Sequence, residues 1–224
     1  MRVLAVETST LAGGAALLDG ARVLGEYRLD LRLTHSERLM VAVDRLLGDA
    51  GWTPHDLEGL AVAVGPGSFT GLRIGLAAVK GLALALAIPV AGVPTLDAMA
   101  ASLSHAALPV CPVLDARKHE VYACRYRWDG AAMRREWDYL AAAPAEIARR
   151  LDEPTLLLGD AAGQIRSPHA RVAEPPSRLP SPAWVGWLGL AALRAGATVA
   201  PADLVPIYLR PSEAELKRRA AALR

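Results

Sequence analysis

Two acidic residues each end an apolar run, where a strand would deliver them to the edge of a sheet. Glu7 is followed by three hydroxyl side chains, Thr8, Ser9 and Thr10, whereas Asp115 is followed by no glycine. In two-lobed nucleotide-binding folds, acids at such strand ends face a cleft and hold a metal-bound phosphate. Residues 7–10 are therefore a weak nucleotide-binding candidate, with capping of the next turn as the alternative. For Asp115 we expect capping alone, because phosphate needs the close backbone approach that glycine permits.

The stretch GPGSFTGLRIG, residues 65–75, joins a strand-like run to a long apolar helix through a glycine-rich turn. No Gly-Lys-Ser/Thr closes it as in a Walker loop, and Lys80 lies well inside the helix. Pro66 weakens its likeness to a dinucleotide loop, and Ser68 does not fit the G-x-S-x-G pattern of a nucleophile elbow. The stretch thus predicts a tight turn rather than a phosphate site or a catalytic nucleophile.

Metal-ligating and redox-active side chains are scattered along the chain. The five histidines lack the helical spacing of four or the nearby acids that a metal site needs, so we expect no metal and no peptidase activity. Cys111 and Cys124 both lie in strand-like runs, which predicts buried free thiols. We accordingly assign no catalytic residue.

The first half of the chain reads as three strands, a helix and a fourth strand. Asp19–Gly20 between apolar runs predicts a hairpin, and Thr34 with Glu37 forms a capping box before a helix with one apolar face. The predicted strands span residues 2–6, 12–18, 21–27 and 60–64.

The second half repeats this order in outline. A strand over residues 110–114 ends at Asp115, strands over 121–128 and 133–140 flank Asp129–Gly130, and a helix over 144–151 precedes a strand over 155–158 that ends at Gly159. We read the chain as a duplicated β-β-β-α-β-α unit, with a mixed sheet and crossover helices in each half. Residues 1–104 and 105–224 would form the two lobes, with an irregular connection over 167–182 and helices over 184–195 and from Ser212.

The helix after the glycine turn is apolar nearly all round. Leu72, Leu76 and Val79 share one face, while Gly71 and Gly75 belong to a face of small residues, as do 77, 81 and 85. A helix of this kind buries more than one face. A closely packed partner helix and a position sandwiched inside one domain are both open explanations.

Bulk properties bound the class of protein. The chain has 224 residues, 53% of them hydrophobic, and a net charge of +2, which does not argue for nucleic acid. We expect a cytoplasmic protein, because residues 1–10 make a poor secretory signal and the apolar tract 77–90, interrupted by Lys80 and Pro89, is too short to cross a bilayer.

Several motifs in order along the chain carry a family resemblance. They are LAVETST at 4–10, THSERLM at 34–40, GPGSFTGLRIG at 65–75, LDARKHEVY at 114–122 and YLRPSEAE at 208–215. The chain resembles the TsaB/YeaZ family, the small subunits of the bacterial machinery that makes threonylcarbamoyladenosine in tRNA. The resemblance implies the actin-like ATPase fold, a duplicated ribonuclease H-like α/β fold of two lobes.

The resemblance also implies a non-catalytic subunit. A larger paralogue would carry the metal site and transfer the threonylcarbamoyl group to the adenosine beside the anticodon, in tRNAs that read codons starting with A. A small P-loop ATPase would join the assembly, and this chain would pair with a second copy when alone. Contact with tRNA would be indirect, no nucleotide would be tightly bound, and ATP or ADP would bind only at a composite site.

Carried over by position, the partner interface uses two first-lobe helices. Its expected residues are His35, Leu39, Val43, Phe69, Gly71, Leu72, Arg73, Gly75 and Leu76. On this hypothesis, Gly75→Leu abolishes pairing with the paralogue and leaves the fold intact. The competing class is an enzyme, a small-molecule kinase or ATPase of the same fold that uses Glu7 and Thr8 to Thr10.

Overall fold

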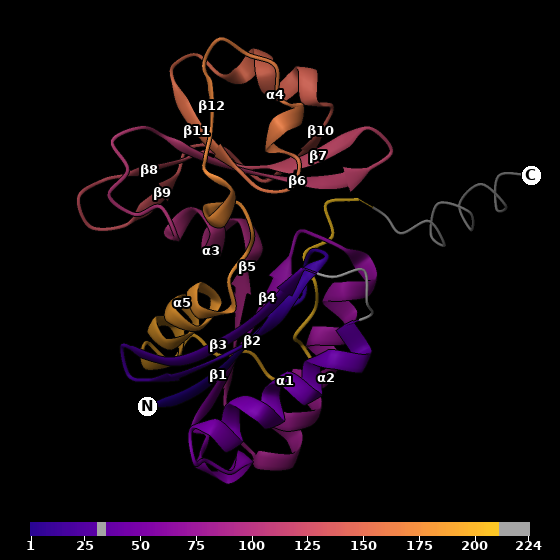
Figure 1. Ribbon diagram of the computed structural model, residues 1–224, viewed down its shortest axis with the longest axis vertical. Helices are drawn as coiled ribbons and strands as arrows, with labels where there is room; N and C mark the ends of the chain where they lie inside the picture. Colours follow the sequence, from indigo (N-terminus) through magenta and orange to yellow (C-terminus); the bar gives the residue numbers. More distant parts are fainter. Residues whose placement is uncertain (31–34, 211–224) are drawn as a thin grey trace, which may run out of the picture.

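The structure, a computed structural model, describes residues 1–30 and 35–210. It contains a five-stranded and a seven-stranded sheet, which lie one above the other in Figure 1. We call the five-stranded sheet with the helices packed on it the first lobe, and the seven-stranded sheet with its helices the second lobe. The predicted capping residue Thr34 and the predicted helix from Ser212 lie outside the described residues.

The sheet of the first lobe has the order β3-β2-β1-β4-β5. The first three strands are antiparallel, and β4 and β5 continue the sheet in parallel with β1. The hairpin predicted at Asp19–Gly20 is confirmed, because Asp19 pairs with Arg22 and Gly20 has the positive φ of 55° that such turns favour. The strands are β1 (Arg2–Glu7), β2 (Ala12–Asp19), β3 (Arg22–Asp30), β4 (Gly59–Gly65) and β5 (Val90–Pro94).

Helices cover both faces of this sheet. Alternation along β1 places Leu4 and Val6 in a core with α1 (His35–Asp49) and α2 (Phe69–Leu86), and places Val3 and Ala5 in a second core with α5 (Pro182–Arg194). Figure 1 shows α1 and α2 on one side of the strands and α5 on the other. The predicted division of the chain after residue 104 stays a prediction; α5, which follows it in sequence, packs on the first-lobe sheet.

The sheet of the second lobe repeats this topology. Its order β10-β7-β6-β11-β12 corresponds position by position to β3-β2-β1-β4-β5. The strands are β6 (Val110–Arg117), β7 (Glu120–Ala123), β8 (Tyr126–Trp128), β9 (Met133–Arg135), β10 (Leu140–Ala142), β11 (Thr155–Leu158) and β12 (Ala170–Val172). The helices are α3 (Thr95–Ala101) and α4 (Pro144–Arg150), with short 3-10 turns η1 (Pro54–Asp56), η2 (Ala162–Gln164) and η3 (Pro175–Ser177). The predicted duplication is therefore present.

The strands of the second lobe differ in detail from the sequence prediction. The run 121–128 does not form one strand, because β7 ends at Ala123 and β8 begins at Tyr126. The Asp129–Gly130 hairpin joins β8 to β9, an elaboration inserted between β7 and β10. The predicted strand over 133–140 is wrong for the same reason, since only its first three residues pair with β8.

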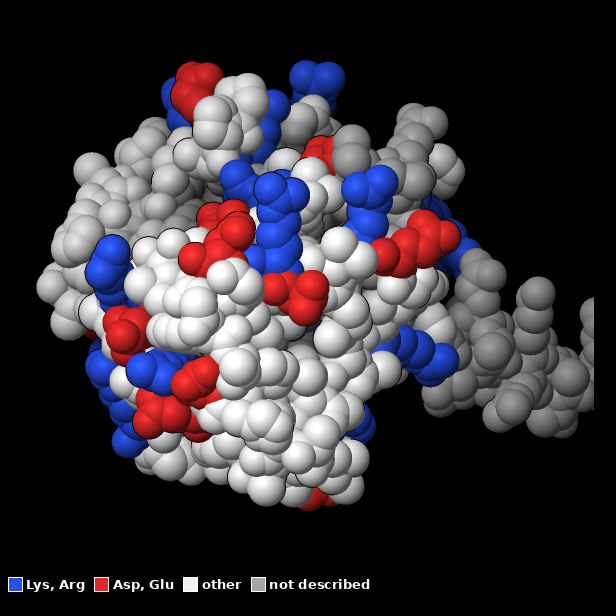
Figure 2. Space-filling model, turned by 60° about the horizontal axis from the view of Figure 1, so that its bottom comes forward, with Lys and Arg blue, Asp and Glu red and all other residues white. Residues whose placement is uncertain are grey.

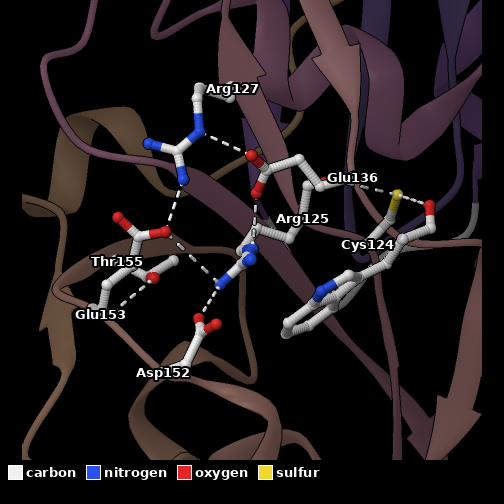
Figure 3. A network of polar contacts seen from close by, with 8 residues as sticks. Cys124, Arg125, Arg127, Glu136, Asp152, Glu153 and Thr155 are labelled. Carbon is white, nitrogen blue, oxygen red and sulfur yellow. Dashed lines mark hydrogen bonds and ion pairs between the residues drawn. The ribbon is translucent and has the colours of Figure 1, made fainter.

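A buried arginine anchors this inserted hairpin (Figure 3). The Arg125 side chain is 11% exposed, with its Nε 2.7 Å from Glu136, and it also pairs with Asp152 and Glu153 in the segment between α4 and β11. Arg127 bridges Glu136 and Glu153. A buried guanidinium needs such acids, because an unpaired charge inside a protein is costly. The network fixes β8 and β9 to the rest of the second lobe.

Helix α2 has 18 residues and, among the described residues, is the one helix long and apolar enough to cross a membrane by length and composition. The apolar tract predicted from sequence began at residue 77 and was too short, whereas the helix begins at Phe69. Its buried residues, including Leu72, Leu76 and Val79, pack in the core on the first-lobe sheet, as those of a core helix do.

The glycines of α2 face two different environments. A Cβ on Gly75 would lie 2.3 Å from Thr8 Oγ1 and 3.3 Å from Val6 Cγ1, so this glycine permits close contact with β1. A Cβ on Gly81 would meet nothing within 4 Å. The expectation that Gly75→Leu leaves the fold intact is therefore wrong, because the space is filled by the chain's own first strand.

We expect Gly75→Ala to lower the free energy of unfolding by about 1–3 kcal/mol, because the added methyl forces Thr8 or the helix to move. Gly81→Ala in the same helix is the matched control. It should raise the free energy of unfolding by up to ~1 kcal/mol, the difference in helix propensity. Urea denaturation of both variants and the parent measures this, and equal stabilities for the two variants would contradict the packing described.

Candidate functional site

A cavity of about 550 Å³ lies between the two lobes. The first lobe contributes the loop after β1 and the start of α2, and the second lobe contributes the turn after β6 and the residue after Gly159. A late segment of the chain completes the wall. The lining residues are Ser9, Thr10, Leu11, Gly67, Ser68, Phe69, Thr70, Leu114, Asp115, Ala116, Arg117, Lys118, Tyr122, Asp160, Tyr208 and Arg210.

The first-lobe side of the cavity is built by two tightly packed turns. Ser68 donates its backbone N–H to the carbonyl oxygen of Ser9 at 2.6 Å, and a Cβ on Gly67 would lie 2.4 Å from that oxygen. The peptide bond between Gly65 and Pro66 is cis. Ser68 also caps α2, accepting the N–H of Gly71 at 3.3 Å. The glycine-rich stretch thus folds against the protein's own loop, as a turn rather than a phosphate cradle.

Glu7 is fully buried beneath this loop. One carboxyl oxygen, Oε1, accepts the backbone N–H of Ser9, and the other, Oε2, has no partner. Burial raises the pKa of Glu7 to about 7, an effect that its hydrogen bonds to Ser9 only partly oppose. Because the carboxyl is buried, a ligand in the cavity would meet Ser9 and Thr10 before it.

The hydroxyls predicted to accompany Glu7 are also buried, but two of them reach the cavity. The side-chain oxygens of Thr8 and Ser9 are buried and without a partner, whereas Thr10 Oγ1 donates to the Ala12 carbonyl oxygen at 2.9 Å. Ser9 and Thr10 line the cavity. The structure thus brings the four predicted residues together, with only the last two placed to touch a ligand.

The second-lobe side is formed by a turn without glycine. Asp115 donates its N–H to Asp160 Oδ1 at 2.9 Å, and its own carboxylate accepts the N–H of Arg117 at 2.8 Å. Burial raises the pKa of Asp160. Arg117, Lys118 and His119 all have positive φ, between 52° and 63°. The role predicted for Asp115, capping of the turn, is confirmed.

The predicted interface residues are divided by the fold. Phe69 and Arg73 are exposed, and the side chain of His35 lies outside the described part of the chain. Six others are buried in the first lobe: Leu39, Val43, Gly71, Leu72, Gly75 and Leu76. Because buried side chains present no surface to a second protein, these six are corrected to core residues. An interface on α1 and α2 has to use the outward faces of the helices.

Sequence reasoning gave no role to Tyr122, Tyr208 or Arg210, which line the cavity from elements far apart in the sequence. Tyr208 and Arg210 stand in the YLRPSEAE motif, and that motif was the only available signal. Across residues 1–30 and 35–210, no three His, Cys, Asp or Glu side chains gather into a group that could hold a metal ion.

Comparisons with known proteins point to one group. A family model described as TsaD, tRNA N6-adenosine threonylcarbamoyltransferase, matches residues 31–168. The tRNA threonylcarbamoyladenosine biosynthesis protein TsaB of Bacillus subtilis is 34% identical over 227 residues, covering 97% of this chain and 97% of the relative. The structure of YeaZ from Pseudomonas aeruginosa has a TM-score of 0.81 at 30% identity, covering 93% of this chain and 99% of that one.

A more distant structure shares the fold. The activator of 2-hydroxyisocaproyl-CoA dehydratase from Clostridium difficile has a TM-score of 0.51 at 6% identity, covering 88% of this chain and 97% of that chain. Together with the two equivalent sheets, these likenesses confirm the predicted actin-like, two-lobed α/β fold.

The buried carboxyl predicts a pH-dependent stability. The folded state keeps a proton on Glu7 that the unfolded chain releases above its pKa of 4.5, so the stabilisation is complete below pH 4.5 and is lost as the pH rises through about 7. Relative to Glu7→Gln, the parent should lose about 3 kcal/mol of unfolding free energy over this range. Denaturant titrations across the range measure the difference.

Glu174→Gln, the same change at an exposed acid, is the control and should follow the pH profile of the parent. A constant difference between the parent and Glu7→Gln at every pH would show that Glu7 is charged in the folded protein throughout.

Proposed function

Because this chain belongs to the TsaB/YeaZ family of tRNA threonylcarbamoyladenosine biosynthesis proteins, we propose that it is a non-catalytic subunit of the complex that performs this modification. The complex transfers a threonylcarbamoyl group to the adenosine beside the anticodon, in tRNAs that read codons starting with A. In this proposal a paralogue of the TsaD type performs the transfer in the cytoplasm, and this chain binds it and holds it in its active arrangement.

The observation that carries this proposal is the outward face of α2. Ala77, Gly81 and Ala85 recur at every fourth position and are all exposed, and Leu84 next to them is 73% exposed. Small side chains at this spacing let a second helix approach closely. On the neighbouring α1, Met40 and Val41 are exposed as well. In Figure 2, the lower right of the face shown carries few charged side chains, on the side where α1 and α2 lie in Figure 1.

We assign the outward faces of α1 and α2 to the paralogue, or to a second copy of this chain when the paralogue is absent. Apolar and small residues at the centre of such a surface exclude water on binding. Phe69 and Arg73, the two exposed residues of the predicted set, lie at the start of the same helix. A small P-loop ATPase would bind the joined pair, ATP or ADP would occupy only the composite site, and tRNA contact would be indirect.

The geometry supports a non-catalytic role over the enzyme alternative. Glu7 is buried under its own loop, and the carboxylates of Asp115 and Asp160 accept backbone hydrogen bonds of the turn. The observation that favours a kinase or ATPase is the unpartnered hydroxyl of Ser9 at the cavity, together with Thr10.

Calorimetric titration of the isolated chain with ATP and magnesium distinguishes the two functions. We expect no tight binding, because the wall opposite Ser9 is a glycine-free turn that leaves phosphate no close backbone approach. Tight, saturable binding that Ser9→Ala abolishes would favour the enzyme and contradict the proposal.

Reconstituted tRNA modification with and without this chain tests the role directly. We expect modification to require the chain, and to be lost in Ala77→Arg, because a charge buried against a partner helix weakens association roughly a hundredfold. Ala191→Arg on α5, also an exposed helical alanine, is the matched control and should retain activity. Co-purification with the TsaD-type paralogue measures binding separately. Full binding by Ala77→Arg would place the interface elsewhere.

A further inference from the structure

A late segment of the chain, residues 205–210, runs from the first lobe to the second. Leu204 is buried in the first-lobe core, and Ile207 donates its backbone N–H to the Val64 carbonyl oxygen at 2.7 Å, at the end of β4. In Figure 1 this yellow stretch rises from the lower sheet towards the upper one. The segment has no helix or strand of its own, so its position depends on a few side-chain contacts.

The first-lobe contact is made by an aromatic ring. Tyr208 stacks on Phe69 with ring centres 5.2 Å apart and planes 28° from parallel. Its hydroxyl accepts a hydrogen bond from Arg73 Nε at 3.1 Å, and the Arg73 guanidinium lies 3.8 Å from the centre of the Phe69 ring. Tyr208 is therefore held at the start of α2 by stacking, a hydrogen bond and a cation held on the same ring.

The second-lobe contact is an ion pair. Arg210 lies 2.7 Å from Glu120, the first residue of β7, and both side chains are partly exposed. Tyr208 and Arg210 both line the cavity between the lobes, opposite Ser9 and Thr10 on the first-lobe loop. The two contacts therefore lie on opposite sides of the same cavity, joined by a single intervening residue.

We propose that residues 205–210 form a clasp that holds the lobes together across the cavity and controls access to Ser9. The inference needs neither a partner protein nor the proposed function. Partly exposed ion pairs and single aromatic contacts each contribute little, so the closed state exceeds the open state by a modest factor. A clasp of this strength opens and closes without unfolding either lobe.

Thiol labelling tests the clasp in the full chain. Ser9→Cys places a thiol at the buried, unpartnered hydroxyl, where no hydrogen bond is lost, and the native Cys111 and Cys124 are fully buried in the second lobe. Peptide mass spectrometry follows each thiol separately. We expect Arg210→Ala to raise the labelling rate at position 9 roughly fivefold, and Tyr208→Ala roughly tenfold.

Arg150→Ala is the matched control, because its ion pair with Glu146 is similarly exposed but lies within one helix. It should leave labelling at position 9 unchanged. Equal rates in Arg210→Ala, Tyr208→Ala and the parent would overturn the clasp. So would a parallel rise at Cys111 and Cys124, which would mean that the whole fold has loosened.

A second measurement avoids the Ser9→Cys change altogether. Hydrogen exchange in a peptide covering residues 8–14 should be faster in Arg210→Ala than in Arg150→Ala. Identical exchange in these two variants would overturn the proposal.

Discussion

The close packing of the Gly65–Ser68 turn and of Gly75 against the end of β1 is the constraint on which the rest of the structure depends. At both Gly67 and Gly75, a Cβ would lie within 2.4 Å of atoms of the β1 loop. No side chain fits at either position, so the backbone of α2 approaches the sheet more closely than an ordinary helix would. This fixes which face of α2 is buried, and hence which face it offers to solvent.

The same packing explains the unusual chemistry of the loop. Pressing the turn onto residues 8–10 seals Glu7 from water, and burial of a carboxyl favours its neutral form. The hydroxyls of Thr8 and Ser9 are left without partners, each of which costs stability. These costs are offset by the apolar core that α2 completes with β1 and β4. The loop is therefore held by its surroundings rather than by its own hydrogen bonds.

Local signals in the sequence were enough for most of the elements. The Asp19–Gly20 hairpin, the strand at 155–158 and the apolar stripe of α1 follow from turn chemistry and periodicity, which depend on neighbours in sequence. Breaks within apolar runs were missed, because the run 121–128 gives no sign that Arg125 needs acids from distant segments. Long-range charge pairing, rather than propensity, decided where β7 ends and β8 begins.

The candidate site was predicted less completely, for a related reason. Residues 7–10 are contiguous and were found together, whereas Tyr208 and Arg210 join the site only through tertiary contacts. The glycines of α2 were misread because sequence spacing shows that small residues share a face but not what covers that face. Gly75 faces the chain's own Thr8, and only the stripe at 77, 81 and 85 faces outward.

The two halves of the duplication have diverged at the step that matters for assembly. Gly159 keeps the turn of its first-lobe counterpart, with φ of 113° beside 102° at Gly65, and a Cβ there would collide with Val113. Beyond it, however, the second lobe has only the three-residue turn η2 where the first lobe has α2. A long helix with a free outward face therefore follows the glycine turn only in the first lobe. The second lobe contributes a charged turn to the cavity instead, so the surface for a partner and the wall of the cavity have become separate tasks of the two halves.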